Sequence, residues 1–193
     1  MSRLVLASAS PRRLELLKQI HITPDLVLPA DINEDELKGE LPKKYVERIT
    51  RGKIEATLKK PEAKDSYVIS ADTTVACGRL ILPKSEDPET ARMCLEKMSG
   101  RRHIILGGIA VADPSGQINY RCVETTVKFK RLTAPEIQTY IDSREWDGKA
   151  GGYGIQGMAA QFITFLSGSY SNVVGLSLYD IAQMLKGSGY ATD

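Results

Sequence analysis

LVLASASPRRLELL, at residues 4–17, joins an apolar strand directly to a helix. Small residues end the strand, Ser10 stands where an N-cap is needed, and Pro11 suits the first helical position. The positive end of the helix dipole lies there, so Arg12 and Arg13 add like charge to it. An anion would relieve this repulsion, because backbone N–H groups, a serine hydroxyl and guanidinium groups all bind phosphate. The stretch therefore predicts a phosphate site, with two solvated arginines on an ordinary helix as the alternative.

The length and composition are those of a folded globular protein. The 193 residues suit one domain over residues 1–193, built as a unit or as two closely packed lobes. Hydrophobic residues make up 42% and charged residues 26% of the chain. Three cysteines without a CxxC pair favour buried reduced thiols over disulfides or a zinc site. We expect a cytoplasmic protein, because the apolar run at the amino end is far shorter than the roughly 20 residues that cross a bilayer.

The overall charge and the aromatic content argue against a nucleic-acid partner. The net charge is +2 and only 6% of the residues are aromatic. Nucleic-acid-binding proteins usually have a strongly basic face, and those that bind single strands interleave basic side chains with stacking aromatic rings. The sequence has neither pattern. We expect no nucleic-acid partner and no membrane partner, and the positive charges of interest are local ones.

Strand and helix patterns alternate after the first helix. Strands are expected at residues 26–28, 67–71, 80–82, 103–112, 118–130 and 162–166. Helices are expected at residues 42–60, from Pro88 to Gly100, after the capping box Thr133–Glu136, and around residues 178–185. The turn-forming residues 113–116 predict that the two long strands form a hairpin, and residues 167–172 read as a polar turn.

Asp72 follows the expected strand 67–71 and begins the sequence Asp72-Thr73-Thr74. Ligands of open α/β sheets bind at the carboxyl ends of strands, so this position makes Asp72 a candidate site residue. The ordinary alternative is an aspartate that caps a turn through its side chain.

Six charged residues lie in loops or at the ends of expected elements: Arg12, Arg13, Glu34, Lys53, Asp72 and Lys84. Phosphoryl chemistry needs Lys and Arg against phosphate oxygens and Asp or Glu on a divalent cation. A water activated by the metal or by a carboxylate would then attack phosphorus. The alternatives are structural: Glu34 belongs to an acidic run of the kind that is usually solvated, and Lys53 and Lys84 are surface lysines by default.

Residues 149–157 contain four glycines and read as a loop shaped by its backbone. The segment has neither the GxGxxG pattern nor the GxxxxGK[ST] pattern, so it indicates neither a dinucleotide fold nor a P-loop. The two histidines, His21 and His103, have no nucleophile motif beside them and are expected to be structural.

Several of these motifs, taken in order, resemble the Maf family of nucleoside triphosphate pyrophosphatases. The resemblance is carried by residues 6–13, 71–73, 95–103, 149–157 and 168–176. It implies hydrolysis between the α and β phosphates of a nucleoside triphosphate, with a divalent cation, Mg2+ or Mn2+, as cofactor. The implied fold is an α/β protein with a long mixed central sheet and helices, in two lobes around a deep cleft, similar to the inosine triphosphatase fold.

The resemblance also assigns a role to each matching position. It implies that the catalytic residues are Asp72, as acid/base, with Glu34 and Lys84, and that the metal ligands are Glu34 and Asp72. The phosphates would be held by Ser10, Arg13, Lys53 and Lys84. Substrate choice would be tuned by the positions that match the branch acting on dTTP and UTP, which are Arg12, Thr73 and Gln156. A glutamine amide offers both a donor and an acceptor to a pyrimidine edge, which agrees with that branch.

Two positions depart from the family pattern. Pro83-Lys84-Ser85 stands where the family commonly has Gly-Lys-Pro, so the lysine is kept while its neighbours differ, and Ser177 replaces a common proline. Neither change removes a charged group from the expected chemistry.

The leading hypothesis is a pyrophosphatase that hydrolyses dTTP, UTP or modified nucleotides to the monophosphate and prevents their misincorporation. The alternative, suggested by the family's association with septum formation, is a regulator of cell division that binds a nucleotide without obligatory turnover. The resemblance also makes a homodimer possible. No apolar stripe in the sequence identifies an interface for it.

Overall fold

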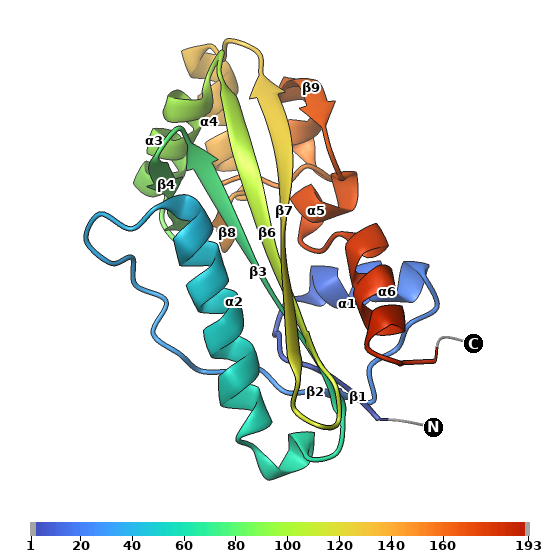
Figure 1. The fold of residues 1–193 in the computed structure, drawn as a ribbon. Coiled ribbons are helices and arrows are strands. Elements are labelled where there is room, and N and C mark those ends of the chain that lie inside the picture. Colours follow the sequence, from blue (N-terminus) through green and yellow to red (C-terminus); the bar gives the residue numbers. More distant parts are fainter. Residues whose placement is uncertain (1–2, 192–193) are drawn as a thin grey trace.

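A long, mixed β-sheet runs through the molecule and positions everything else (Figure 1). The computed structural model describes residues 3–191. The strands of the sheet are β1 (Leu4–Leu6), β2 (Leu26–Val27), β3 (Tyr67–Cys77), β4 (Leu80–Leu82), β6 (Arg102–Ala112), β7 (Ile118–Phe129) and β9 (Ile163–Ser167). Their order is β2-β1-β3-β6-β7-β9, with β4 paired to β3, and β1 runs parallel to its two neighbours while the other pairs are antiparallel. A separate two-stranded ribbon joins β5 (Lys84–Ser85) to β8 (Lys149–Ala150).

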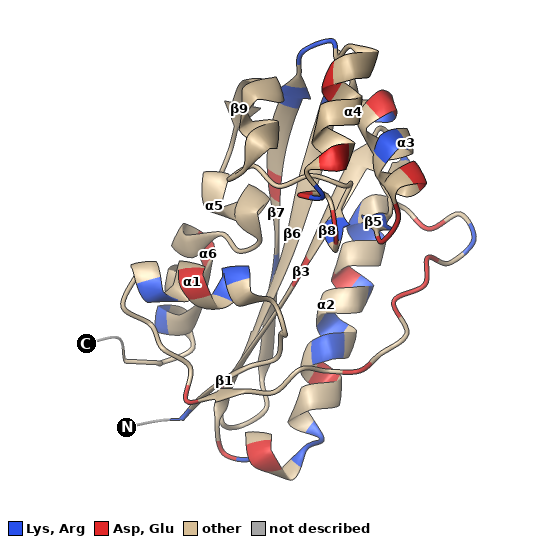
Figure 2. Cartoon of the chain, turned by 180° about the vertical axis from the view of Figure 1, so that it is seen from behind, with Lys and Arg blue, Asp and Glu red and all other residues tan. Residues whose placement is uncertain are grey.

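Helices cover both faces of the sheet (Figures 1 and 2). The helices are α1 (Pro11–Gln19), α2 (Pro42–Leu58), α3 (Pro88–Met98), α4 (Ala134–Asp142), α5 (Tyr170–Val174) and α6 (Leu178–Gly187), with short 3-10 turns at Pro61–Ala63 and Met158–Phe162. Helix α2 lies on one face, and α1, α5 and α6 lie on the other. None of the helices in residues 3–191 is both long enough and apolar enough to cross a membrane.

The apolar residues form three buried clusters. One packs beneath α3 and α4 around Met98 and Tyr140. A second fills the space between the sheet and helices α1 and α6, with Leu17 and Ile181 fully buried. The third lies under α2 and includes Ile54.

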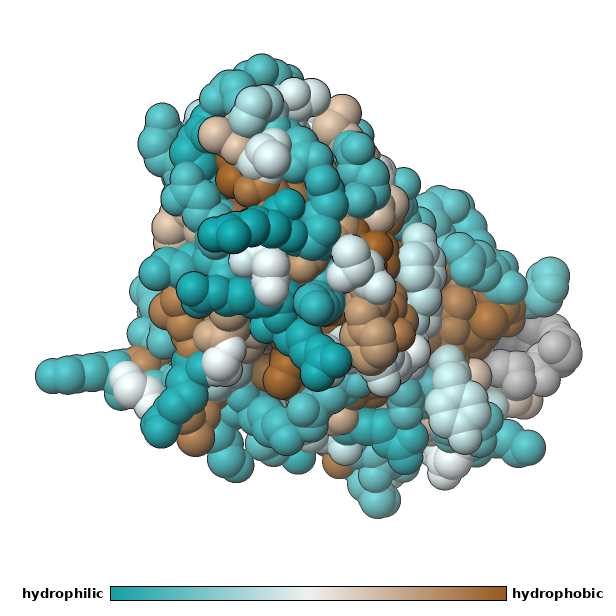
Figure 3. Space-filling model, turned by 90° about the horizontal axis from the view of Figure 1, so that it is seen from above, coloured by the Kyte–Doolittle hydropathy of each residue, from teal (hydrophilic) through white to brown (hydrophobic). Residues whose placement is uncertain are grey.

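Seen from above, the end of the molecule is mostly hydrophilic at its surface, with small hydrophobic areas between the hydrophilic ones (Figure 3). The predicted α/β class with a mixed sheet is confirmed.

Local turn chemistry explains two elements that the sequence predicts. Strands β6 and β7 pair antiparallel along their length, and the Asp113 side chain accepts the Ser115 backbone N–H at 2.8 Å in the turn between them. At the start of α4, Thr133 and Glu136 form a reciprocal capping box, in which the Glu136 carboxylate accepts the Thr133 N–H at 2.9 Å. Both predictions are confirmed.

Two predicted boundaries are wrong. Strand β3 does not end at Ala71 but continues to Cys77, because its pairing with β6 runs on to the register pair Ala76–Ile104. Asp72 therefore lies within a strand and not at its carboxyl end. The segment predicted as a polar turn at 167–172 instead contributes to β9 and opens α5, where the Ser169 hydroxyl caps the helix by accepting the Asn172 N–H at 3.1 Å.

Gly108 allows α2 to approach the sheet closely. A Cβ added there would lie 2.1 Å from Thr50 Oγ1 and 3.1 Å from the Val46 carbonyl oxygen. That hydroxyl donates to the same carbonyl at 2.6 Å, so neither atom can move without breaking a buried hydrogen bond.

We expect Gly108→Ala to lower the free energy of unfolding by about 1–3 kcal/mol, the usual effect of overpacking a core. Urea denaturation measures this. Gly187→Ala is the matched control, since a Cβ at that position meets no atom within 4 Å, and it should leave stability within about 1 kcal/mol of the parent. Equal unfolding free energies of the two variants would contradict this expectation, because they would show that α2 can move away from the added Cβ without loss of stability.

His103 is buried, and its burial changes the pKa of the imidazole. Its Nε2 atom lies 2.8 Å from the Tyr153 hydroxyl in the cluster beneath α3, and burial lowers the pKa of the imidazole from 6.5 to about 4. The folded protein therefore binds this proton less readily than the unfolded chain does.

Stability contributed by neutral His103 is complete above pH 6.5 and is lost as the pH falls to about 4. Relative to a His103→Gln variant, which cannot titrate, the parent should lose about 3 kcal/mol of unfolding free energy across that window. Urea denaturation at several pH values gives the difference. His21→Asn, which removes the exposed histidine, should keep the dependence of the parent; its disappearance there would contradict the assignment to His103.

Candidate active site

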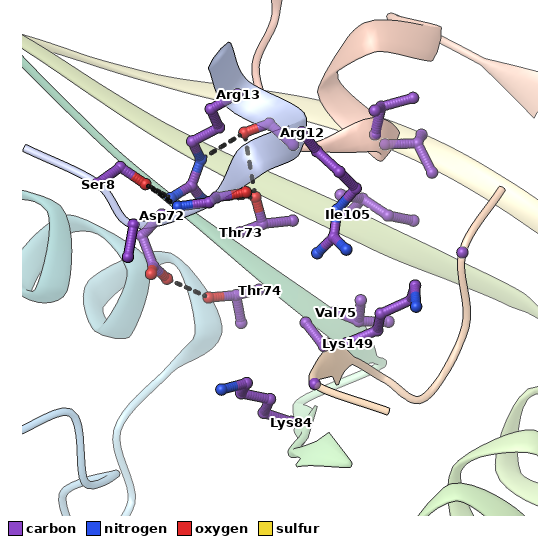
Figure 4. A pocket seen from close by; sticks show the side chains of 18 of the residues that line it. Ser8, Arg12, Arg13, Asp72, Thr73, Thr74, Val75, Lys84, Ile105 and Lys149 are labelled. Carbon is purple, nitrogen blue, oxygen red and sulfur yellow. Dashed lines mark hydrogen bonds between the residues drawn. The ribbon is translucent and has the colours of Figure 1, made fainter. Parts of the chain in front are cut away.

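A cavity of about 740 Å³ opens beside the middle of β3, where distant segments of the chain meet (Figure 4). The start of α1, the loop before α2, the ribbon of β5 and β8, and the glycine-rich segment all contribute to its wall. The structure brings every site residue predicted from the sequence into this cavity: Ser10, Arg12, Arg13, Glu34, Lys53, Asp72, Thr73, Lys84 and Gln156.

Asp72 and Glu34 meet at one ammonium group. Lys53, on the inner side of α2, places its Nζ atom 2.7 Å from Asp72 Oδ1 and 2.9 Å from Glu34 Oε1. The other Asp72 oxygen accepts the Thr74 hydroxyl at 3.4 Å. Lys53 is 12% exposed in its side chain, so it is not a surface lysine, and Asp72 caps no turn. Two carboxylates and one ammonium leave a net negative charge at this wall of the cavity.

Arg13 is buried and tied to the protein. Its guanidinium group donates to the Gly175 carbonyl at 2.9 Å, the Ser8 hydroxyl at 2.8 Å and the Thr73 hydroxyl at 3.2 Å. Burial lowers the pKa of Arg13, and the negative charge of Asp72 opposes this shift. The alternative of a solvated arginine is therefore wrong at this position. Arg13 fixes the start of α1 against β3 and still brings a positive charge to the cavity wall.

Arg12 and Ser10 have unused polar groups at the same helix end. Ser10 occupies the N-cap position as predicted, but its side chain makes no capping hydrogen bond. Arg12 is exposed and extends into the space beside β3 (Figure 4), and it forms no ion pair with any residue that the structure describes. Among residues 3–191 the Ser10 hydroxyl and the Arg12 guanidinium have no hydrogen-bond partner, so both groups are available to an anion at this helix end.

Two lysines reach the cavity from the ribbon of β5 and β8. Lys84 is 61% exposed in its side chain, and its nearest carboxylate, on Glu86, is 3.5 Å away. Lys149 is half-buried, and its pKa is lowered by burial and then by the charge of Arg12. Lys149 lines the cavity but was not among the site residues predicted from the sequence. Its place at the head of the glycine-rich segment was the available signal.

The glycine-rich segment is shaped by its backbone, as predicted. Gly151 and Gly152 have φ values of +65° and +67°, and a Cβ at Gly152 would lie 2.7 Å from the Ser85 hydroxyl. The segment carries Gln156 to the cavity with an exposed side chain. Within the described part of the chain, the Gln156 amide has no hydrogen-bond partner, so its donor and its acceptor are both open to a ligand.

Comparison with known proteins decides the family. The family model described as Maf-like protein matches residues 3–188. This chain belongs to the Maf family. It is 55% identical to a dTTP/UTP pyrophosphatase of Paramagnetospirillum magneticum, over 99% of this chain and 100% of that protein. A dTTP/UTP pyrophosphatase of Rhodospirillum rubrum is 51% identical over 97% of this chain and 88% of that protein.

A solved structure shows the fold that this Maf protein adopts. The structure of a HAM1 protein from Coxiella burnetii aligns with a TM-score of 0.53 and covers 97% of this chain and 100% of that one. The identity is 13%, so the likeness concerns the fold alone. It agrees with the α/β architecture expected from the sequence.

The acidic wall of this Maf site suits a hard divalent cation. Among residues 3–191, no group of three or more His, Cys, Asp or Glu side chains could hold a metal ion by itself. Mg2+ commonly uses only one or two carboxylates, with substrate phosphates and water completing its ligands. Asp72 and Glu34 supply two carboxylates that already converge on one positive charge, the Lys53 ammonium. The residues present therefore fit such a cation with bound substrate.

Proposed function

We propose that this Maf-family protein hydrolyses dTTP and UTP to the nucleoside monophosphate and pyrophosphate. The observation that carries the proposal is the buried Asp72 carboxylate, which shares the Lys53 ammonium with Glu34 and faces a cavity whose other walls carry arginine and lysine side chains. The names of the two bacterial relatives, both dTTP/UTP pyrophosphatases, support the same reaction.

The cationic and the acidic residues have different roles in this reaction. Arg12, Arg13 and Lys84 bind the phosphate chain and neutralise the charge that gathers on the leaving pyrophosphate. Asp72 accepts a proton from water as that water adds to a phosphorus of the α–β anhydride and the bridging oxygen departs. Asp72 and Glu34 would hold a divalent cation, Mg2+ or Mn2+, which when bound would supply further charge neutralisation and lower the pKa of water. Lys53 keeps the two carboxylates together between turnovers.

The open amide of Gln156 gives the preference for thymine and uracil. These bases present an N–H donor beside carbonyl acceptors, and a glutamine amide complements both. Thr73 donates to the Gly175 carbonyl at 3.4 Å and accepts from Arg13, so it is a fixed part of the wall against which the substrate lies. Arg12 extends into the same cavity.

Initial rates of pyrophosphate release from dTTP, UTP, CTP, GTP and ATP, with Mg2+ or Mn2+, test this proposal. We expect dTTP or UTP to be hydrolysed fastest. If a triphosphate with another base were hydrolysed fastest, the proposed reaction would stand and the role given to Gln156 would be rejected. Tight binding of every triphosphate without any product would reject the pyrophosphatase and support a nucleotide-binding regulator.

A further inference from the structure

The loop that carries Glu34 has no regular structure of its own. Residues 28–41 connect β2 to α2 without a helix or strand, and the loop runs beside α2 (Figure 1). The Glu34 side chain is 50% exposed, yet its carboxylate is placed 2.9 Å from Lys53 Nζ. None of residues 28–41 is fully buried, so polar contacts are needed to hold the loop at the cavity.

Two side chains of α2, one turn apart, hold the backbone of this loop. Tyr45 donates its hydroxyl to the Glu34 carbonyl oxygen at 2.9 Å, and Arg48 donates to the carbonyl oxygen of the next residue, Asp35, at 2.9 Å. The Arg48 guanidinium lies over the Tyr45 ring, 5.5 Å from its centre. Two consecutive carbonyl groups are thus fixed by one stacked pair.

Arg48 also closes the far end of the loop. Its Nε and Nη2 atoms each lie 2.7 Å from an oxygen of Glu40, whose side chain is 9% exposed. The same carboxylate accepts the Leu37 N–H at 3.2 Å. A planar, two-pronged contact of this kind restricts orientation as well as distance, which a lysine in its place could not do.

We propose that Arg48 and Tyr45 form a clamp that positions Glu34 for metal binding. The inference rests on the proposed function, in which Glu34 acts with Asp72 on a divalent cation. Arg48 does not line the cavity, and Tyr45 lines it with a hydroxyl that donates to the Glu34 carbonyl oxygen. Both are positioning residues, since they act through the backbone on either side of the Glu34 carbonyl.

The test compares Arg48→Met with Arg51→Met. Arg51 is a matched control on the same helix. It contacts a carboxylate, Glu47, at 3.1 Å and lies 4.9 Å from the centre of the Tyr120 ring, but it forms no hydrogen bond or ion pair with the described residues 28–41. Hydrogen exchange of peptides covering residues 28–41, in protein without added metal, should become about tenfold faster in Arg48→Met and stay unchanged in the control.

The second readout is metal binding. The Mg2+ concentration for half-maximal dTTP hydrolysis should rise about tenfold in Arg48→Met, the scale found when groups that orient metal ligands are removed, and direct Mn2+ binding should weaken equally. Tyr45→Phe removes only the hydroxyl and should shift exchange and Mn2+ binding in the same direction by about threefold. It remains informative if Arg48→Met folds poorly.

If hydrogen exchange of residues 28–41 were unchanged in both Arg48→Met and Tyr45→Phe, the clamp would be overturned. Faster exchange with unchanged Mn2+ binding would overturn its role in positioning Glu34. Failure of the parent protein to hydrolyse any triphosphate would reject the proposed function instead, and in that case exchange and Mn2+ binding still decide whether the clamp holds Glu34 in place.

Discussion

Asp72→Asn is expected to release pyrophosphate from dTTP about 100 to 10,000 times more slowly than the parent protein, the range typical of groups that transfer a proton or stabilise developing charge. The substitution barely alters size, but an amide cannot take a proton from water. It also removes the charge that faces Lys53 Nζ at 2.7 Å. The initial rate at saturating dTTP and Mg2+ measures the effect.

Asp142→Asn is the control for this variant. Asp142 is an exposed aspartate on α4 that accepts a hydrogen bond from Gln138 at 2.7 Å, and it does not line the cavity. Its substitution should leave the rate unchanged. Near-normal activity of Asp72→Asn would show that another carboxylate performs the chemistry.

Lys53→Met should reduce kcat/KM for dTTP by about 100- to 1,000-fold, the scale seen when one preorganised charged or polar donor is removed from an active site. The apolar side chain would leave the carboxylates of Asp72 and Glu34 facing each other without the ammonium that now lies within 2.9 Å of both. Steady-state kinetics at a fixed, saturating Mg2+ concentration gives the ratio.

The matched control is Lys44→Met on the same helix. The Lys44 side chain is 76% exposed and lies 3.5 Å from Glu47, a contact of the kind that contributes little. We expect parental kinetics there. If both lysine variants kept parental kinetics, the ammonium between the two carboxylates would be dispensable, and the site would have to work without the arrangement that the structure shows.

Local chemistry made part of the fold predictable. The turn formers at 113–116 and the box formed by Thr133 and Glu136 are satisfied by neighbours in sequence, so their elements could be recognised without knowledge of the rest of the chain. The length of β3 could not be predicted from local chemistry. Asp72 is a poor strand former, and the strand continues past it only because β6, more than thirty residues later, supplies the pairing.

The site was predictable to a similar degree. The family resemblance selected residues that all line one cavity. The expected placement of the charges in loops or at element ends was wrong for Lys53, which lies within α2, and for Asp72, which lies within β3. The particular partners were not accessible, because they depend on tertiary contacts. Arg13 donates to the carbonyl of Gly175, which lies 162 residues later. Arg48 of α2 donates to the carbonyl of Asp35, in a loop whose sequence has no helix or strand pattern.

The identity of the products tests the central claim most directly. The purified protein should convert dTTP, with Mg2+ present, into dTMP and pyrophosphate in equal amounts, as measured by chromatographic separation of nucleotides and an assay that distinguishes pyrophosphate from orthophosphate. Release of dTDP and orthophosphate would place the cleavage at the wrong bond. Intact dTTP after prolonged incubation at high protein concentration would contradict the proposed reaction altogether.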